Sequence, residues 1–293
     1  MVFGFKIRRI WGSLILAITA VILIIARPGA SQTVLVSPNN PQLGDTLSVV
    51  IRQNVDRGRP PIVTMDGKTY PTFAMDGSGR FRALLPTTPL ERPGARHIRV
   101  TGDNASQNIT VQVSDRYFPT QSIWLPPDKE DLERTPLEFE RLEEFKARVT
   151  PEKYWNGPFV RPNEGPVSTG YGVRRYYNGE FAEDYYHRGI DYADYEGGAI
   201  VAPAAGIVGL VGLESQGFEI NGNTIGIDHG QGVTSAFVHL SRIDVKEGDF
   251  VKAGQIIGGV GSTGISTGPH LHWGLYVHGI SIDPVPWRFE GIE

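Results

Sequence analysis

Turn residues break most of this chain into short β-type segments, and this pattern limits the folds that it can adopt. The 293 residues include 36 glycines and 21 prolines. A first group of segments comprises 33–37, 46–53, 62–65, 81–85, 96–101 and 108–113. These segments are rich in β-branched residues, and turn pairs such as Asp66-Gly67 and Pro93-Gly94 separate them. About seven short strands in roughly eighty residues predict an immunoglobulin-like β-sandwich over residues 32–114.

A second group of β-type segments follows residue 157, where glycine becomes dense and charge becomes sparse. Its members are 200–202, 207–211, 224–228, 234–239, 256–260 and 270–277. Glycine permits left-handed turns and the close approach of neighbouring strands. Residues 157–293 are therefore predicted to form a Gly-rich β-sheet domain, and the predicted fold class is all-β.

Residues 115–156 are predicted to connect the two β-domains through one short helix. Thr135, Pro136 and Glu138 match a helix start, with a capping residue, a proline at the first helical position and an acidic residue three positions after the cap. Apolar residues then recur at helical spacing: Phe139, Leu142, Phe145 and Val149. We expect this narrow apolar stripe to pack on the adjacent domain.

The N-terminus predicts export. Lys6, Arg8 and Arg9 form a basic flank ahead of an apolar run over residues 10–26. A basic flank, an apolar run and small residues after it are typical of a secretory signal or an uncleaved anchor. Residues 1–31 are therefore predicted to direct the chain to the periplasm or cell envelope, either as a cleaved signal peptide or attached to the cytoplasmic membrane.

Charge and cysteine content exclude several functions. The net charge of −4 at pH 7 gives no electrostatic basis for binding nucleic acid. The chain has no cysteine, which excludes disulfides, thiolate catalysis and cysteine-based zinc fingers. The sequence does not indicate an oligomeric state.

Five residues of the second domain can support metal chemistry: His187, Asp191, His239, His270 and His272. Residues two apart in a strand face the same side, so His270 and His272 are expected to point into one cleft, about 6–7 Å apart along the strand. Gly189 favours a turn running into a strand between His187 and Asp191, and side chains on either side of such a bend can converge. Catalytic zinc commonly uses three protein ligands and leaves a fourth position for water. One or both histidines of the H-x-H pair can then be ligands.

The strings around these residues resemble the lysostaphin-type zinc metallopeptidases, which cut peptidoglycan peptides. That family shows an H-x-x-x-D, a later histidine at a strand end before L-S, and an H-x-H. These elements stand here as His187…Asp191, His239 and His270…His272. The flanking strings 169–174, 222–224, 228–230, 247–249 and 268–269 match as well, and the resemblance covers a little under half of the chain. It implies one zinc ion bound by His187, Asp191 and His272, with His239 and His270 as the catalytic pair.

The resemblance and the predicted export together imply a zinc-dependent endopeptidase of peptidoglycan. It would act on stem peptides or cross-links, with a metal-activated water as nucleophile. His270 is the expected general base and His239 the expected partner of the developing oxyanion, but the two roles can be exchanged. The alternative is a non-catalytic protein of the same fold that binds the cell wall or activates another hydrolase.

Residues flanking the five are candidates for substrate contact. Tyr171 and Trp273 are predicted to line a groove for an extended peptide, and Arg174 to meet a substrate carboxylate. The polar stretch 175–184 is predicted to form a loop over the cleft.

Overall fold

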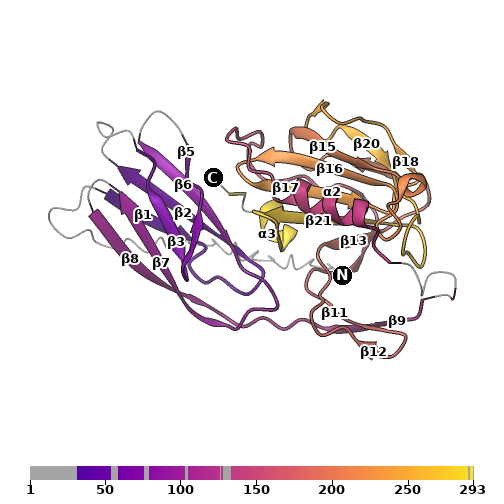
Figure 1. Cartoon of the computed structure of the whole chain (residues 1–293), viewed down its shortest axis with the longest axis horizontal. Coiled ribbons are helices and arrows are strands. Elements are labelled where there is room, and N and C mark those ends of the chain that lie inside the picture. Colours follow the sequence, from indigo (N-terminus) through magenta and orange to yellow (C-terminus); the bar gives the residue numbers. More distant parts are fainter. Residues whose placement is uncertain are drawn as a thin grey trace, which may run out of the picture.

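The computed structural model describes residues 32–53, 59–75, 79–102, 105–125, 127, 133–289 and 291–292. The predicted export segment, residues 1–31, lies outside these ranges. Strands dominate the described residues, and the prediction of an all-β chain is confirmed. Figure 1 shows two lobes, with the N-terminal strands at the left and the C-terminal strands at the right.

The N-terminal lobe consists of two four-stranded sheets, ordered β1-β2-β6-β5 and β4-β3-β7-β8. The strands are β1 Gln32–Ser37, β2 Thr46–Gln53, β3 Ile62–Met65, β4 Lys68–Tyr70, β5 Phe73–Ala74, β6 Arg80–Pro86, β7 Gly94–Gly102 and β8 Ala105–Val113. Leu47, Ile51, Val63 and Val100 come from both sheets and are fully buried in one core. Each such side chain stabilises the fold by about 1.5–3 kcal/mol. The immunoglobulin-like description of this lobe stays a prediction.

The C-terminal lobe is built on an eight-stranded antiparallel sheet, ordered β10-β13-β21-β17-β16-β15-β19, with β22 paired to β21. A smaller sheet, β14-β20-β18, shares its core. The strands are β10 Val167–Thr169, β13 Ile190–Ala193, β14 Ala199–Val201, β15 Gly206–Gly212, β16 Thr224–Gly230, β17 Val233–Val238, β18 Arg242–Ile243, β19 Phe250–Val251, β20 Ile256–Gly259, β21 His270–Val277 and β22 Ile280–Ile282. A short 3-10 turn, η2 (Glu214–Gln216), and helix α3 (Pro284–Phe289) complete the lobe.

Helix α2 (Pro136–Lys146) packs on the large sheet, and it starts where the sequence predicts. The Thr135 side chain accepts a hydrogen bond from the Glu138 N–H at 3.1 Å, which caps the first turn. Leu142 and Phe145 are buried against Leu210 and Phe218. The predicted stripe is shorter than expected, because Phe139 and Val149 are 55% and 47% exposed. Within the part of the chain that the structure describes, no helix is long and apolar enough to span a bilayer.

The connector also contributes a strand that the sequence analysis did not anticipate. β9 (Thr120–Ile123) pairs in parallel with β11 (Arg174–Tyr177), which pairs with β12 (Glu180–Phe181). The stretch predicted as a loop over the cleft is therefore largely a hairpin, and that prediction is wrong in form. Main-chain hydrogen bonds hold it to the connector, below the large sheet in the view of Figure 1.

A buried arginine joins the two lobes. Arg82 on β6 is 1% exposed, and its guanidinium donates to Gln231 Oε1 at 2.5 Å and to the Ile292 carbonyl at 3.0 Å. It also lies over the Trp155 ring, 5.0 Å from the centroid. A buried arginine held by several partners is costly to disturb, so the lobes have a defined orientation.

Candidate metal centre and groove

Strand pairing brings Asp191 and His272 together. β13 and β21 are antiparallel neighbours in which Asp191 lies directly opposite His272. Because successive side chains of a strand alternate between faces, both point to one face of the sheet. Leu271 and Trp273 point to the other face and are fully buried in the core. The sheet register therefore fixes two of the predicted ligands relative to each other.

A glycine lets the chain bring His187 to the same place. Gly189 lies against β21, and a Cβ at this position would stand 2.3 Å from the Trp273 carbonyl oxygen and 2.9 Å from His272 Cε1. Only glycine allows so close a passage. The His187 N–H donates to the Val173 carbonyl at 2.8 Å, which anchors the segment ahead of β13.

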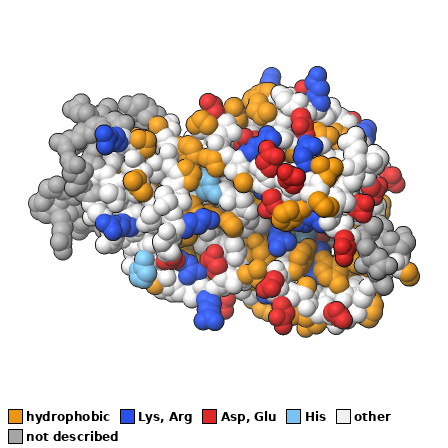
Figure 2. Space-filling model, in the orientation of Figure 1, with side chains coloured by type: hydrophobic (Ala, Val, Ile, Leu, Met, Phe, Trp, Pro, Cys, Tyr) orange, Lys and Arg blue, Asp and Glu red, His pale blue; other side chains and the backbone are white. Residues whose placement is uncertain are grey.

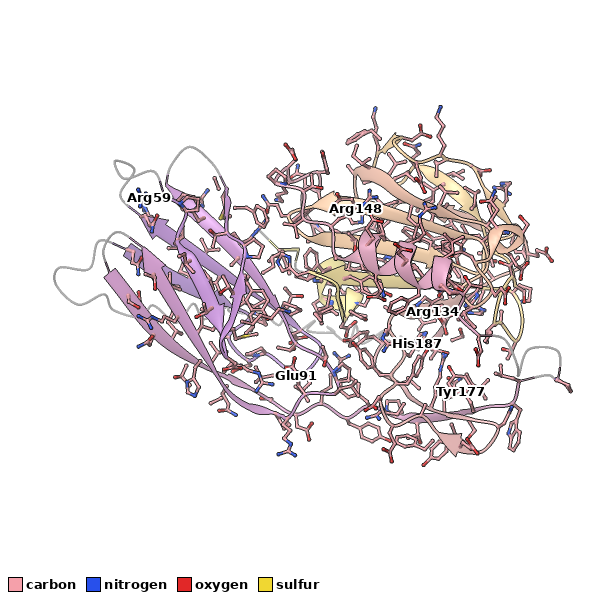
Figure 3. The ribbon with its side chains drawn as sticks, viewed as in Figure 1. Arg59, Glu91, Arg134, Arg148, Tyr177 and His187 are labelled. Carbon is pink, nitrogen blue, oxygen red and sulfur yellow. The ribbon has the colours of Figure 1, made fainter. Side chains whose placement is uncertain are left out.

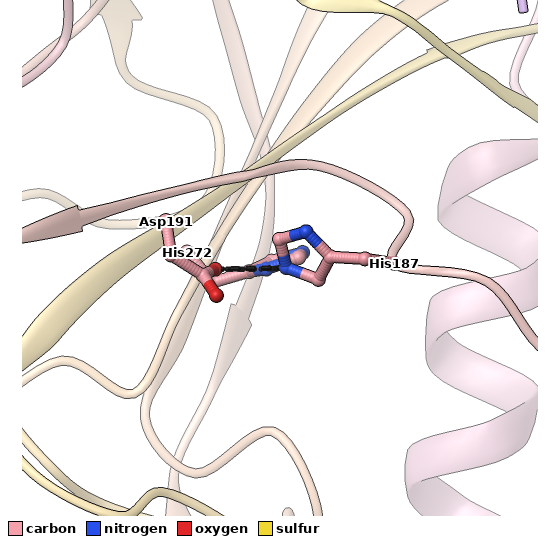
Figure 4. Close-up of side chains that lie close together, drawn as sticks. All are labelled: His187, Asp191 and His272. Carbon is pink, nitrogen blue, oxygen red and sulfur yellow. Dashed lines mark hydrogen bonds and ion pairs between the residues drawn. The ribbon is translucent and has the colours of Figure 1, made fainter. Parts of the chain in front are cut away.

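The three side chains, which we call the ligand triad, converge on one point (Figure 4). His187 Nε2 lies 2.9 Å from Asp191 Oδ1 and 2.9 Å from His272 Nδ1, and the last two atoms are 2.8 Å apart. Ligand atoms around a tetrahedral zinc ion at ~2.0 Å lie roughly 3.3 Å from one another. Small outward movements would therefore admit an ion.

The hydrogen bonds of the triad favour a cation at its centre. His187 Nδ1 lies 2.7 Å from the Gly170 carbonyl oxygen, so this nitrogen carries the proton and Nε2 presents a lone pair. Asp191 Oδ1 also presents lone pairs to the same point. Atoms of this kind, packed closely in a buried place, fit a metal ion.

Electrostatics keep Asp191 and His272 of the triad in the ligand form at neutral pH. Burial opposes ionisation of Asp191, but the charge and hydrogen bonds of His187, followed by those of His272, hold its pKa well below the usual range. Burial lowers the pKa of His272 to about 4, although Asp191 acts in the opposite direction. A carboxylate and neutral imidazoles are the forms that bind metal.

His239 and His270, the histidine pair, stand beside the triad with their ring centroids 5.0 Å apart. His239 Nδ1 lies 2.8 Å from the Thr263 carbonyl oxygen, and His270 Nδ1 lies 2.8 Å from that of Gly268. Each Nδ1–H donates to a main-chain carbonyl, so each Nε2 presents a lone pair. His270 Nε2 lies 4.0 Å from Asp191 Oδ1. Both rings thus present an acceptor nitrogen beside the triad, although burial lowers the pKa of His239 to about 3.

His239 adopts an unusual backbone conformation, and a carboxylate from the connector helps to fix it. It follows β17 with φ of 66°, a left-handed value, and its N–H donates to the Asn221 carbonyl at 2.8 Å. The Glu138 side chain is fully buried and accepts from the Asn221 N–H at 2.8 Å, the Asn221 amide at 2.5 Å and the Ile220 N–H at 3.1 Å. Strained backbone persists where its surroundings over-determine it.

The triad and the pair line an open groove of about 1170 Å³. Its walls come from the connector, α2, the 185–188 segment and the 265–270 loop, with Thr88 and Leu90 of the N-terminal lobe at its edge. In Figure 3, Arg134 and His187 mark two of these segments, and Tyr177 marks the end of β11, which also lines the groove. A groove of this size can take an extended peptide.

The three predicted substrate contacts are not in the groove. Trp273 is fully buried, and its indole N–H donates to Ser235 Oγ at 3.1 Å. Tyr171 is 5% exposed, and its hydroxyl donates to the Ser281 carbonyl at 2.8 Å. The Arg174 guanidinium donates to the Tyr185 carbonyl at 2.9 Å and to the Glu183 carbonyl. These side chains pack or brace the structure, and their assignment to substrate is corrected.

Two residues that support the site, Glu138 and Arg175, escaped sequence reasoning. Glu138 matches a capping box, yet its carboxylate reaches the 220–221 loop. Arg175 lies in the stretch predicted as a loop, and its guanidinium is 3.5 Å from Asp191 Oδ2. For Trp273, the sequence did contain a signal. Side chains alternate along a strand, so the rule that places His270 and His272 on one face also places Trp273 on the opposite face.

Known proteins share this region. Residues 185–284 match the model of Peptidase family M23. Lysostaphin of Staphylococcus staphylolyticus is 42% identical over 106 residues, and Peptidoglycan DD-endopeptidase ShyC of Vibrio cholerae is 42% identical over 98 residues. These alignments cover 34% and 33% of this chain, and 22% of each relative. The match thus spans about a fifth of the length of these relatives.

A solved structure is similar over most of the chain. It is a peptidase M23 from Pseudomonas aeruginosa, 29% identical with a TM-score of 0.63, and the alignment covers 87% of this chain and 97% of that one. The resemblance to lysostaphin-type enzymes predicted from the sequence is confirmed. Residues 185–284 of this chain therefore match peptidase family M23, and the chain is similar to an M23 peptidase structure over 87% of its length.

Proposed function

We propose that this protein is a zinc-dependent endopeptidase that hydrolyses peptide bonds in peptidoglycan. The observation that carries the proposal is the convergence of His187 Nε2, Asp191 Oδ1 and His272 Nδ1 within 2.9 Å of one another, beside two more histidines in an open groove. The similarity to the peptidoglycan DD-endopeptidase of Vibrio cholerae supports peptidoglycan as the substrate. The basic flank and apolar run at the N-terminus support an envelope location.

Zinc suits this donor set of imidazoles and a carboxylate. When bound, it supplies a Lewis acid for a carbonyl oxygen and lowers the pKa of a water molecule in the open position toward ~7. Gly170 and Arg175 orient the triad through His187 Nδ1 and Asp191 Oδ2. Such supporting contacts typically change metal affinity or activity by ~10–100-fold.

The histidine pair performs the proton transfers. His270 is the more exposed of the two and lies nearer to Asp191, so we assign it as the base that takes the proton of the nucleophilic water. The resulting imidazolium then donates a proton to the departing amine. His239, whose Nδ1–H donates to the Thr263 carbonyl, is assigned to accept a hydrogen bond from the nucleophilic water through Nε2. A placed histidine contributes ~10²–10⁴-fold to such a reaction.

The test combines metal analysis with hydrolysis of purified sacculi. Wild-type protein should bind one zinc ion per chain and reduce sacculus turbidity. His270→Ala should keep the zinc and lose hydrolysis by ~10²–10⁴-fold. His97→Ala is the matched control, because His97 lies exposed on the N-terminal lobe.

Tight zinc binding without cleavage of any sacculus or muropeptide would contradict the proposal. Wall binding that survives the loss of His187 and His272, again without hydrolysis by the wild type, would favour the non-catalytic alternative.

A further inference from the structure

A cluster of basic residues borders the groove and has no part in the chemistry assigned to the triad and the pair. Arg134, Lys146 and Arg188, which we call the basic rim, line the same groove as His187. They come from distant parts of the sequence: Arg134 precedes α2, Lys146 ends it, and Arg188 follows a triad residue. Figure 2 shows Lys and Arg side chains in the hollow beneath α2.

The charge of the basic rim is only partly balanced. Lys146 Nζ pairs with Glu143 Oε1 at 2.5 Å. The Arg188 guanidinium lies over two aromatic rings, 5.2 Å from the Tyr185 centroid and 5.3 Å from that of Tyr186. Across the described ranges, neither Arg134 nor Arg188 forms an ion pair with a carboxylate. Two positive charges therefore remain in excess, in a chain whose net charge is −4.

Arg134 and Arg188 both lie close enough to Lys146 for their charges to act on it. Burial lowers the pKa of Lys146, and the charges of Arg134 and Arg188 lower it further, against the effect of Glu143. Lys146 Nζ lies 5.4 Å from the Tyr276 ring centroid. Burial raises the pKa of Tyr276, and the charges of Arg188 and Arg134 act to lower it. The Lys146 side chain is only 12% exposed, so solvent screens these charges weakly.

An anion bound here would relieve the repulsion. The planar guanidinium of arginine matches a carboxylate with two parallel hydrogen bonds. In the groove of a peptidase, the anion that fits is a carboxylate on the peptide itself. We propose that the basic rim binds a free carboxylate of the peptide substrate and selects such peptides over their amidated forms. This inference rests on the proposed function.

The experiment uses two cross-linked muropeptides of identical sequence, one with its free carboxyl groups intact and one with them converted to amides. The wild type should cleave the free-carboxylate peptide with a kcat/KM about tenfold to a hundredfold higher, mostly through a lower KM. Arg188→Gln should reduce that preference to near one while leaving the amidated peptide almost unaffected. Arg134→Gln should act in the same direction, and it is independent of any disturbance next to His187.

Arg148→Gln is the control, because Arg148 is exposed just beyond α2 and does not line the groove. Equal cleavage of the two peptides by the wild type would overturn the inference, as would equal losses on both peptides in the two variants.

Binding separates this inference from the proposed function. Calorimetry with His270→Ala measures the affinity for each peptide without turnover, and the free-carboxylate peptide should bind about tenfold more tightly. Preferential binding of the free-carboxylate peptide without hydrolysis by the wild type would contradict the proposed function and support the inference about the basic rim. Hydrolysis of both peptides without any preference would support the proposed function and contradict the inference about the basic rim.

Discussion

The ligand triad and the histidine pair lie in one groove but are held by different kinds of structure. Asp191 and His272 are cross-strand neighbours, and their positions follow from the register of β13 and β21. The ring of His270 is oriented by the loop carbonyl of Gly268, and His239 stands beyond the end of β17. The 220–221 loop that holds the His239 backbone is fixed in turn by Glu138 of the connector helix.

This difference separates metal binding from catalysis. The triad depends on the sheet core, which is buried and cooperative. His270 lies on β21, but its ring is oriented by a loop carbonyl, and His239 depends on a loop and on a helix from outside the family-matched segment 185–284. Damage to the sheet should therefore remove both functions, whereas damage to the connector should remove activity and leave the metal. The following predictions test this separation, from the largest expected effect to the smallest.

Asp191→Ala should abolish both metal binding and hydrolysis. The variant lacks the one carboxylate among the three ligands, and the remaining neutral imidazoles bind a divalent ion less tightly. Metal content after gel filtration and turbidity loss of sacculi measure the two effects. His239→Ala provides the comparison, since it should retain one equivalent of metal. A full equivalent of zinc in Asp191→Ala would contradict the assignment of the ligand triad as the metal site.

Gly189→Ala should damage the triad without removing a ligand. Its Cβ would meet the Trp273 carbonyl oxygen at 2.3 Å and push β13 away from β21. We expect a stability loss of about 1–3 kcal/mol and weaker metal binding. Chemical denaturation and zinc titration measure these changes. Gly170→Ala is the steric control, because a Cβ there meets no atom within 4 Å and should change stability by less than about 1 kcal/mol. Equal losses of stability and zinc affinity in the two variants would contradict the conclusion that the register of β13 and β21 positions the triad.

Glu138→Gln should lower kcat while leaving metal content intact. The glutamine amide nitrogen cannot accept a hydrogen bond, so either the Ile220 or the Asn221 N–H loses its partner and the loop that holds the His239 backbone loosens. We expect a loss of about tenfold in kcat with little change in KM, because Glu138 positions His239 and does not touch substrate. Glu140→Gln, on the exposed side of the same helix, is the control. Loss of metal in Glu138→Gln would show that the pair and the triad are not separable.

His229→Asn should change acid stability with the smallest effect on the site. His229 is buried on β16, and burial lowers its pKa from 6.5 to about 4. The neutral ring therefore stabilises the fold above pH 6.5, and this contribution is lost as the pH falls toward 4, because the unfolded chain binds the proton first. The wild type should lose about 2 kcal/mol more than the variant between pH 7 and pH 5. Urea unfolding at the two pH values measures the difference, and identical pH slopes would contradict the assignment.

The parts of this protein that sequence reasoning found share a local signal. Period-two alternation places His270 with His272, and turn residues mark the strand ends. The helix start at Thr135 is also local, since its capping hydrogen bond joins residues three apart. Arg175 and Glu138 were missed because their contacts are to residues far along the chain: Asp191 is 16 positions from Arg175, and Asn221 is 83 positions from Glu138.

The sequence by itself determined which chemistry could be proposed for the chain, because two histidines on one strand face, an H-x-x-x-D ahead of them and a histidine at a strand end are candidate metal ligands and a candidate proton acceptor. The tertiary structure decided which of the other polar and aromatic residues join that site. Trp273 is buried in the core, Glu138 of the connector helix hydrogen-bonds the loop next to His239, and the three cations of the basic rim line the groove. The physical reason is that side-chain alternation is a property of neighbouring residues, whereas burial and charge pairing depend on segments that only folding brings together.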